Sequence, residues 1–171
     1  MACSSIQLGP IAKECKNNTG GVKDVWIIKS EDITSASVDS TTETITGITI
    51  ASGTTFAHWQ FNPETANATS TGTIDNTAGS FFVQTDLALQ FSKMESAKRL
   101  QIKSATLDDT AVIFRDNNNR LWYMGFDNPV YASAMGAETG TAMSDRNGYT
   151  ITLTDLASDL IKEVCVLATV R

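Results

Sequence analysis

The chain has 171 residues, a formal net charge of −6 and only 19% charged residues, and Thr and Ser are abundant. Its length is typical of one domain, so residues 1–171 are treated as a single unit. The acidic balance argues against sequence-specific binding of DNA or RNA, which needs a basic surface, and no apolar run approaches the roughly 18 residues of a membrane span.

Residues 1–21 contain Pro10 and the pair Gly20-Gly21 and show no regular alternation, which predicts an N-terminal arm that ends in a turn. A strand is predicted at 22–29, where the sequence is rich in Val, Ile and Trp. Residues 33–40 give a weaker signal that fits a strand or a loop.

The next segments alternate between apolar and polar residues, which is typical of antiparallel strands. Strands are predicted at 44–51 and 55–61. A polar, Thr-rich strand at 65–74 and an apolar strand at 80–91 flank a turn and are expected to pair as a long hairpin. The buried side of the second strand is assigned to Phe82, Leu87, Leu89 and Phe91.

One helix is predicted at about 94–104, because Ser92 and Glu95 have the spacing of a capping box. Its apolar face is assigned to residues at helical steps, namely Ala97, Leu100 and Leu107. Its basic residues are Lys93, Lys98, Arg99 and Lys103. They form either a solvated helix face or a basic patch that meets an acidic patch on a neighbouring subunit.

The C-terminal third continues the β pattern. Strands at 110–115 and 120–126 flank an Asp/Asn-rich hairpin turn, residues 131–143 are small and predict a long loop, and strands follow at 149–154 and 162–170. Residues 22–171 therefore predict a mainly β fold, an antiparallel β barrel or sandwich flanked by one α-helix, with long loops.

The sequence predicts no catalytic, cofactor-binding or metal site, and hence no enzyme. His58 is the only histidine, and its local sequence holds no nucleophile with a supporting acid. An odd count of three scattered cysteines indicates packing in a reduced compartment, not a disulfide framework; these are Cys3, Cys15 and Cys165. Acidic groups are interpreted as solvated turns rather than a calcium site; they are Asp24, Glu31, Asp32, Asp108, Asp109 and Asp116. The aromatic residues assigned to the core, or in part to an interface, are Trp26, Trp59, Phe81, Phe82, Trp122 and Tyr123.

Several segments together resemble a family of virion proteins of tailed bacteriophages, especially those of Bacteroidetes hosts, that look like tail tube proteins. The resemblance covers about residues 40–165 and is a pattern of strands and turns. Its main segments are a Thr-rich hairpin, Gln-Thr-Asp-Leu-Ala-Leu-Gln-Phe-Ser-Lys-Met-Glu-Ser-Ala-Lys-Arg at 84–99, the hairpin at 116–120 with Leu-Trp-Tyr-Met-Gly at 121–125, Asp-Asn-Pro-Val at 127–130, Glu-Thr-Gly-Thr-Ala at 138–142 and Asp-Arg-Asn-Gly-Tyr at 145–149.

The resemblance implies a virion structural protein of the phage tail, made in the host cytoplasm. Subunits would form rings, usually of six, whose strands join into one barrel, and a loop and the terminal arm would reach the next ring. Partners would be further copies, other tail proteins, and viral DNA that passes through an acidic lumen without sequence-specific binding. Two alternatives stay open: a capsid decoration or head–tail connector protein, and a stand-alone β-sandwich module that binds a sugar or a host protein.

Overall fold

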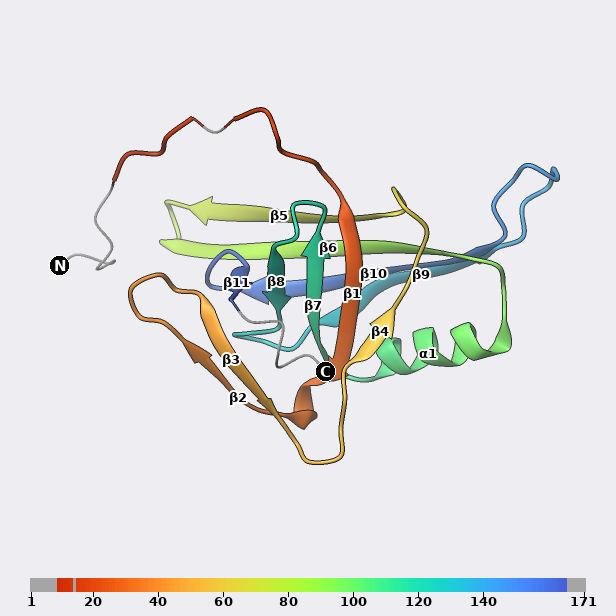
Figure 1. Cartoon of the computed structure of the whole chain (residues 1–171), viewed down its shortest axis with the longest axis horizontal. Coiled ribbons are helices and arrows are strands. Elements are labelled where there is room, and N and C mark those ends of the chain that lie inside the picture. Colours follow the sequence, from red (N-terminus) through yellow and green to blue (C-terminus); the bar gives the residue numbers. More distant parts are fainter. Residues whose placement is uncertain (1–8, 14, 166–171) are drawn as a thin grey trace.

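Seven strands form the larger of two sheets, in the order β2-β3-β11-β8-β7-β1-β4 (Figure 1). All of its pairings are antiparallel except that of β11 with β3. The computed structural model describes residues 9–13 and 15–165. The strands are β1 (Val22–Lys29), β2 (Ile33–Val38), β3 (Ile45–Ile50), β4 (Ala57–Trp59), β7 (Thr110–Asp116), β8 (Leu121–Met124) and β11 (Lys162–Val164), and a short 3-10 helix, η1 (Ser30–Asp32), joins β1 to β2.

Four long strands form the second sheet, which lies across the first (Figure 1). Its order is β5 (Ala66–Asp75), β6 (Ser80–Ser92), β10 (Gly148–Ala157) and β9 (Tyr131–Glu138), and every pairing in it is antiparallel. The predicted hairpin of 65–74 with 80–91 is confirmed, with Ala66 opposite Leu89. The two sheets stay separate, so the predicted mainly β fold is confirmed as a sandwich and not as a closed barrel.

The main core lies between the two sheets. It is built from alternate residues of each strand, because successive side chains of a strand point to opposite faces. Val25 and Val112 of the larger sheet and Leu87 and Leu153 of the smaller one are all fully buried. Burial of each such side chain stabilises the fold by about 1.5–3 kcal/mol. The opposite face of the larger sheet holds a second buried cluster, which includes Ile45, Ile48, Ile113 and Tyr123.

The helix α1 (Ser96–Leu107) lies beside β9 at one side of the sandwich (Figure 1). Its existence was predicted, but its buried face is formed by Ile102 and Ala105, whereas Leu100 and Leu107 are exposed. The predicted capping box is wrong as well: Glu95 is the N-cap and no side chain caps the helix. The helix packs against β9, and this contact, rather than the periodic pattern, selects the buried face.

Other predicted elements differ in extent from those observed. The predicted loop at 131–143 is wrong, because β9 occupies its first half. Residues 33–40, which fitted a strand or a loop, contain β2, and the strand predicted at 55–61 is reduced to β4. The hairpin on either side of the Asp116 turn is confirmed. The strand predicted at 162–170 begins with β11, and its part beyond residue 165 lies outside the described residues.

The described part of the arm, residues 9–13 and 15–21, contains neither helix nor strand, and β1 begins directly after it at Val22. Its end is tied to the turn between β7 and β8. Asn118 accepts a hydrogen bond from the backbone of Thr19 (3.0 Å), and Asn117 donates to the carbonyl of Gly20 (2.6 Å).

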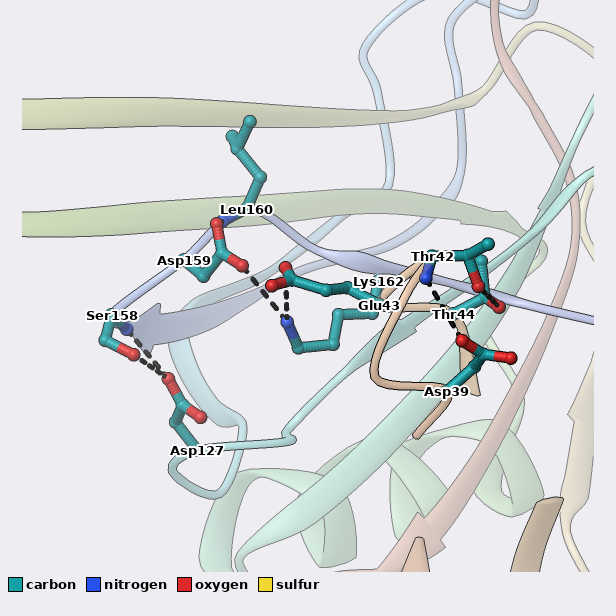
Figure 2. Close-up of polar contacts among 9 residues, drawn as sticks. All are labelled: Asp39, Thr42, Glu43, Thr44, Asp127, Ser158, Asp159, Leu160 and Lys162. Atoms are coloured by element: carbon teal, nitrogen blue, oxygen red, sulfur yellow. Dashed lines mark hydrogen bonds and ion pairs between the residues drawn. The ribbon is translucent and has the colours of Figure 1, made fainter. Parts of the chain in front are cut away.

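A polar cluster around Lys162 fastens the loop before β11 to its neighbours (Figure 2). The Lys162 side chain is only 15% exposed, and its ammonium lies 3.0 Å from Asp159 and 3.7 Å from Glu43 in the turn between β2 and β3. In the same loop, Ser158 donates two hydrogen bonds to Asp127, and these hydrogen bonds lower the pKa of Asp127. The cluster therefore joins three chain segments at the end of the larger sheet.

One buried carboxyl group in the described residues lacks a complete set of partners. Asp155 of β10 is 3% exposed; its Oδ2 accepts a hydrogen bond from the backbone of Gly125 (3.0 Å), but its Oδ1 has no partner. Burial raises the pKa of Asp155, because the charged form loses its hydration. The ionised carboxylate thus reduces the stability of the fold at neutral pH.

We expect Asp155→Asn to raise the free energy of unfolding at pH 7 by about 1–3 kcal/mol, because the neutral amide can keep the bond from Gly125 without burying an incompletely paired charge. The gain should shrink as the pH falls through the raised folded-state pKa of Asp155 towards its ordinary value of 3.8, since Asp155 then becomes neutral in both states. Denaturant unfolding at a series of pH values measures it; a loss of stability at pH 7 would contradict the assignment.

Candidate assembly surface

The four-stranded sheet has one face on the core and one polar face directed away from it, here called the outward face. In β6 the buried residues are Val83, Thr85, Leu87, Leu89 and Phe91, so the residues between them point outward. The registers place outward residues of neighbouring strands side by side. They are Asn67, Thr69, Thr71 and Thr73 on β5, Gln84, Asp86, Ala88 and Gln90 on β6, and Thr150, Thr152 and Thr154 on β10.

Asp86 lies at the centre of the outward face and is held there by its neighbours. Its carboxylate accepts hydrogen bonds from the Thr154 hydroxyl (2.5 Å) and from the Gln84 amide (2.9 Å). The Thr154 hydroxyl also lies 2.8 Å from that of Ser133, which sits at the bulge of β9. This network joins three strands and fixes a negative charge in the middle of the surface.

The charges of the outward face are acidic. The outward strand positions carry Asp75, Asp86 and Glu138 and, among the described strand residues of this sheet, no Lys or Arg. Glu138 is balanced by an ion pair with Arg146 of the adjoining loop. Backbone N–H groups of Ala78 and Thr77 lower the pKa of Asp75, so this carboxylate remains charged well into the acidic range.

Both outer strands of this sheet, β5 and β9, have an unpaired edge within the described residues. Exposed edges are usually protected by charged residues, Pro or bulges, because their free N–H and C=O groups pair readily with other chains. β5 has neither charge nor Pro before Asp75, and β9 has neither before Glu138, although β9 carries a bulge at Ser133. Two long edges thus remain suited to pairing with another strand.

The hairpin of β5 and β6 extends beyond the core and exposes apolar side chains. Ile74, Phe81 and Phe82 are 69%, 50% and 43% exposed. The assignment of Phe81 and Phe82 to the core is therefore wrong. Phe82 shares the outward face with Gln84, while Phe81 points inward opposite Ile74. Tyr123 is buried as predicted, and Trp26, Trp59 and Trp122 are half-buried against the core clusters.

His58 belongs to a cluster with an acid that sequence reasoning missed, because the acid lies 34 residues away. The His58 ring stacks on Trp26, and its Nε2 lies 3.0 Å from Asp24. Asp24 also accepts a hydrogen bond from Arg115 Nε (3.0 Å). Burial opposes ionisation of Asp24, yet the bonds from Arg115 and His58 lower its pKa. The cluster ties β1 to its neighbours β4 and β7.

Of the other acidic candidates, Glu31 and Asp108 come together around Lys29, whereas Asp116 lies apart from them. Asp108 pairs with Lys29 (3.1 Å), and Asp116 closes its turn by accepting a hydrogen bond from the backbone of Arg120 (2.9 Å). No group of three His, Cys, Asp or Glu in the described residues is placed to hold a metal ion. Cys15 and Cys165 are exposed, so the packing interpretation is wrong for these two, and Cys3 lies outside the described residues.

The basic residues of the helical region divide into two pairs. Lys93 and Lys98 both form ion pairs with Glu95, whereas Arg99 and Lys103 have no ion pair among the described residues. Only the second pair is therefore free to meet an acidic partner. The alternative of a solvated face still fits Lys93 and Lys98.

A cavity of about 230 Å³ lies between β4, the end of β6 and α1. Its lining includes Trp59, Phe91 and Ile102, and His58 and Lys98 stand at its rim. Sites for small molecules usually have about 300–1,000 Å³. This cavity lies below that range, whereas a second hollow beside η1 and the end of α1 has about 350 Å³ and lies within it.

Comparisons of the chain with family models, curated proteins and solved structures find no match. The one helix in the described residues, α1, is too short and too polar to cross a membrane. The function is therefore inferred from the geometry of the outward face and of the strand edges beside it.

We expect Asp24→Asn to lower the free energy of unfolding at pH 7 by about 1–3 kcal/mol, because the bonds from Arg115 and His58 lose their charged acceptor. The stability contributed by Asp24 is present above its ordinary pKa of 3.8 and is lost as the pH falls through its lowered folded-state pKa. Thermal unfolding of both forms between pH 7 and pH 2 should therefore converge at the acidic end; a constant difference would contradict this account.

Proposed function

We propose that the chain is a subunit of a bacteriophage tail tube, in which copies join edge to edge into rings and the rings stack around a channel for DNA. The observation that carries this proposal is the pair of long edges on one four-stranded sheet, which are open within the described residues and carry a charge only at the last residue of each strand. The turn and strand pattern that resembles tail tube proteins supports it independently.

Strand directions make the edges compatible with one another. They alternate along the order β5, β6, β10, β9, so β9 of one copy runs antiparallel to β5 of the next copy in a cyclic arrangement. Closure then needs no strand reversal, whatever the number of subunits. Six copies of a four-stranded sheet would make a barrel of 24 strands, about 45 Å across between backbones.

The outward face would line the channel in such a ring, since the larger sheet and α1 cover the other side of the sheet (Figure 1). Its charges are acidic and its remaining side chains are mainly small and neutral. Phosphate groups of DNA would be repelled, so the genome would pass without adhering.

Stacking of rings is assigned to the loop 139–147 between β9 and β10, which projects from one end of the molecule (Figure 1). The loop is internally braced: Asp145 accepts hydrogen bonds from the backbone of Thr141 (2.8 Å) and Ala142 (2.7 Å). Gly140 has a φ of +69°, which other residues rarely adopt. Met143 in this loop is fully exposed, and a flexible apolar side chain of this kind suits contact with a partner.

Electron microscopy of the purified chain tests ring formation, and Gly72→Pro tests the edge. Gln90 donates to the carbonyl of Thr65 (3.1 Å), so alternation along the ladder directs the N–H of Gly72 to the open edge. Pro at this position removes that donor without breaking the pairing of β5 with β6. We expect rings from the natural chain and about a tenfold or greater loss of rings in Gly72→Pro.

The matched control is Gly72→Ala, which keeps the N–H and adds a Cβ at an ordinary 3.4 Å from the Phe81 ring. It should assemble like the natural chain. A natural chain that stays monomeric at high concentration would overturn the proposal: sugar or protein binding by that monomer would favour the stand-alone module, and binding only to capsids would favour the decoration protein.

We expect Met143→Asp to form rings but few stacked tubes, because a charge at the loop would have to be buried between rings. Met143→Leu keeps the apolar contact and should stack normally. Tube length in negative-stain images measures the difference; unchanged tubes in Met143→Asp would remove this loop from the stacking contact.

A further inference from the structure

The four strands of the second sheet are strongly staggered. The registers place only Ala66 to Thr69 of β5 level with residues of β9, namely Tyr131 to Met135. The rest of β5 and the start of β6 extend past β9 at one end, and the last residues of β9 extend past β5 at the other. A flat closure without displacement would therefore leave most of β5 and the last three residues of β9 unpaired.

The mismatch disappears when β9 of one copy pairs with β5 of the next copy at a position displaced along the strands. The displacement must be an even number of residues, because an odd one would direct the inward side chains of one strand against the outward side chains of the next. The smallest even displacement that pairs every residue of β9 in the ladder is four, and six does so as well. Over four strands these displacements correspond to strand tilts of about 35° and 45°, the usual range for closed barrels.

Backbone hydrogen-bonding directions agree with an even displacement. Val130 exchanges two hydrogen bonds with Thr110 (2.8 and 2.9 Å) on the edge side of β9, so alternation directs the backbone groups of Ala132 to the same side. Ala132 is an inward residue, opposite Leu153. On β5, the residues directed to the open edge are also the inward ones, such as Gly72. Inward residues would thus form hydrogen-bonded pairs across the junction.

We propose that Ile74 and Phe81 of one subunit pack against Leu107 and Met135 of its neighbour, so that α1 of each copy covers the overhanging hairpin of the next. This inference rests on the ring of the proposed function and specifies its lateral contact. The displacement of six brings Ile74 level with Ala132 on the inward face, whereas the displacement of four brings it level with Val130, whose backbone groups already bond Thr110. The C-terminal turn of α1 lies over the adjoining part of β9, where the Thr106 hydroxyl meets the Met135 sulfur at 3.5 Å.

The four side chains match in chemistry and in exposure. Leu107 is 73% and Met135 62% exposed, close to the 69% of Ile74 and the 50% of Phe81. Ile74, Phe81 and Met135 lie on the inward face of the same sheet and Leu107 lies at the end of α1, and all four are exposed within the described part of the subunit. Joining them would bury apolar surface on both sides of the junction.

Charge substitutions test the contact. Ile74→Asp and Leu107→Lys should each raise the protein concentration needed for rings by about tenfold or more, because each would place a single charge in an apolar contact. The double variant should recover at least part of that loss, since the two charges would face one another. Unchanged melting temperatures of the monomers would show that the fold is intact, as both side chains are exposed.

Phe82→Asp is the matched control. Phe82 belongs to the same hairpin and is 43% exposed, but it points to the outward face, so its substitution should leave ring formation unchanged. As a second measurement, Ile74→Cys with Leu107→Cys should cross-link neighbouring subunits in a chain whose natural cysteines are Ser, whereas Phe82→Cys with Leu107→Cys should not.

The outcomes separate the two proposals. Rings that form equally well in all single variants, or singles whose effects simply add in the double variant, would overturn the lateral contact and leave the tail tube proposal standing. The absence of rings in the natural chain would overturn both. Loss of rings in the single variants, with recovery in the double variant and selective cross-linking, supports the contact.

Discussion

Backbone hydrogen-bonding groups along the edges of β5 and β9 are the constraint on which the proposed assembly depends. A strand edge presents N–H and C=O groups at a fixed spacing, and in an isolated subunit only water can satisfy them. Natural edges normally carry charges or Pro that discourage pairing. These edges are instead built mainly from Thr, Ser, Ala and Gly, which let another backbone approach closely, and each carries a charge only at its last residue. An assembly that closes on itself satisfies such edges without open-ended aggregation.

The two faces of the smaller sheet have different roles in the proposed assembly. Its inward face, with Leu87 and Leu153, is buried against the larger sheet and stabilises the subunit. Its outward face, with Asp86 at the centre, contributes little to that core. Substitutions on the edges and on the outward face can therefore alter association while the subunit stays folded. The helix α1 belongs to both roles, because Ile102 faces the core and Leu107 faces away from it.

Sequence patterns predicted the hairpins well, since both the turn chemistry and the alternation are local signals. The long hairpin of β5 with β6 and the short one around Asp116 were both found. β9 was missed because its Ala, Gly and Met residues have low β propensity and no alternation. Pairing with β10 makes this segment a strand. The chain's second open edge was thus invisible in the sequence, although it is half of the candidate surface.

The sequence by itself determined the mainly β class, the presence of one helix, the acidic balance and the polar character of β5, because composition and period-two patterns act within a few residues. Only the tertiary structure decided which residues of α1 are buried, that Phe82 faces outward, and that Asp24 meets His58 and Arg115. These outcomes depend on which elements lie against one another. The tertiary structure also decided the stagger of the strands in the second sheet, since a register is a relation between strands far apart in the chain.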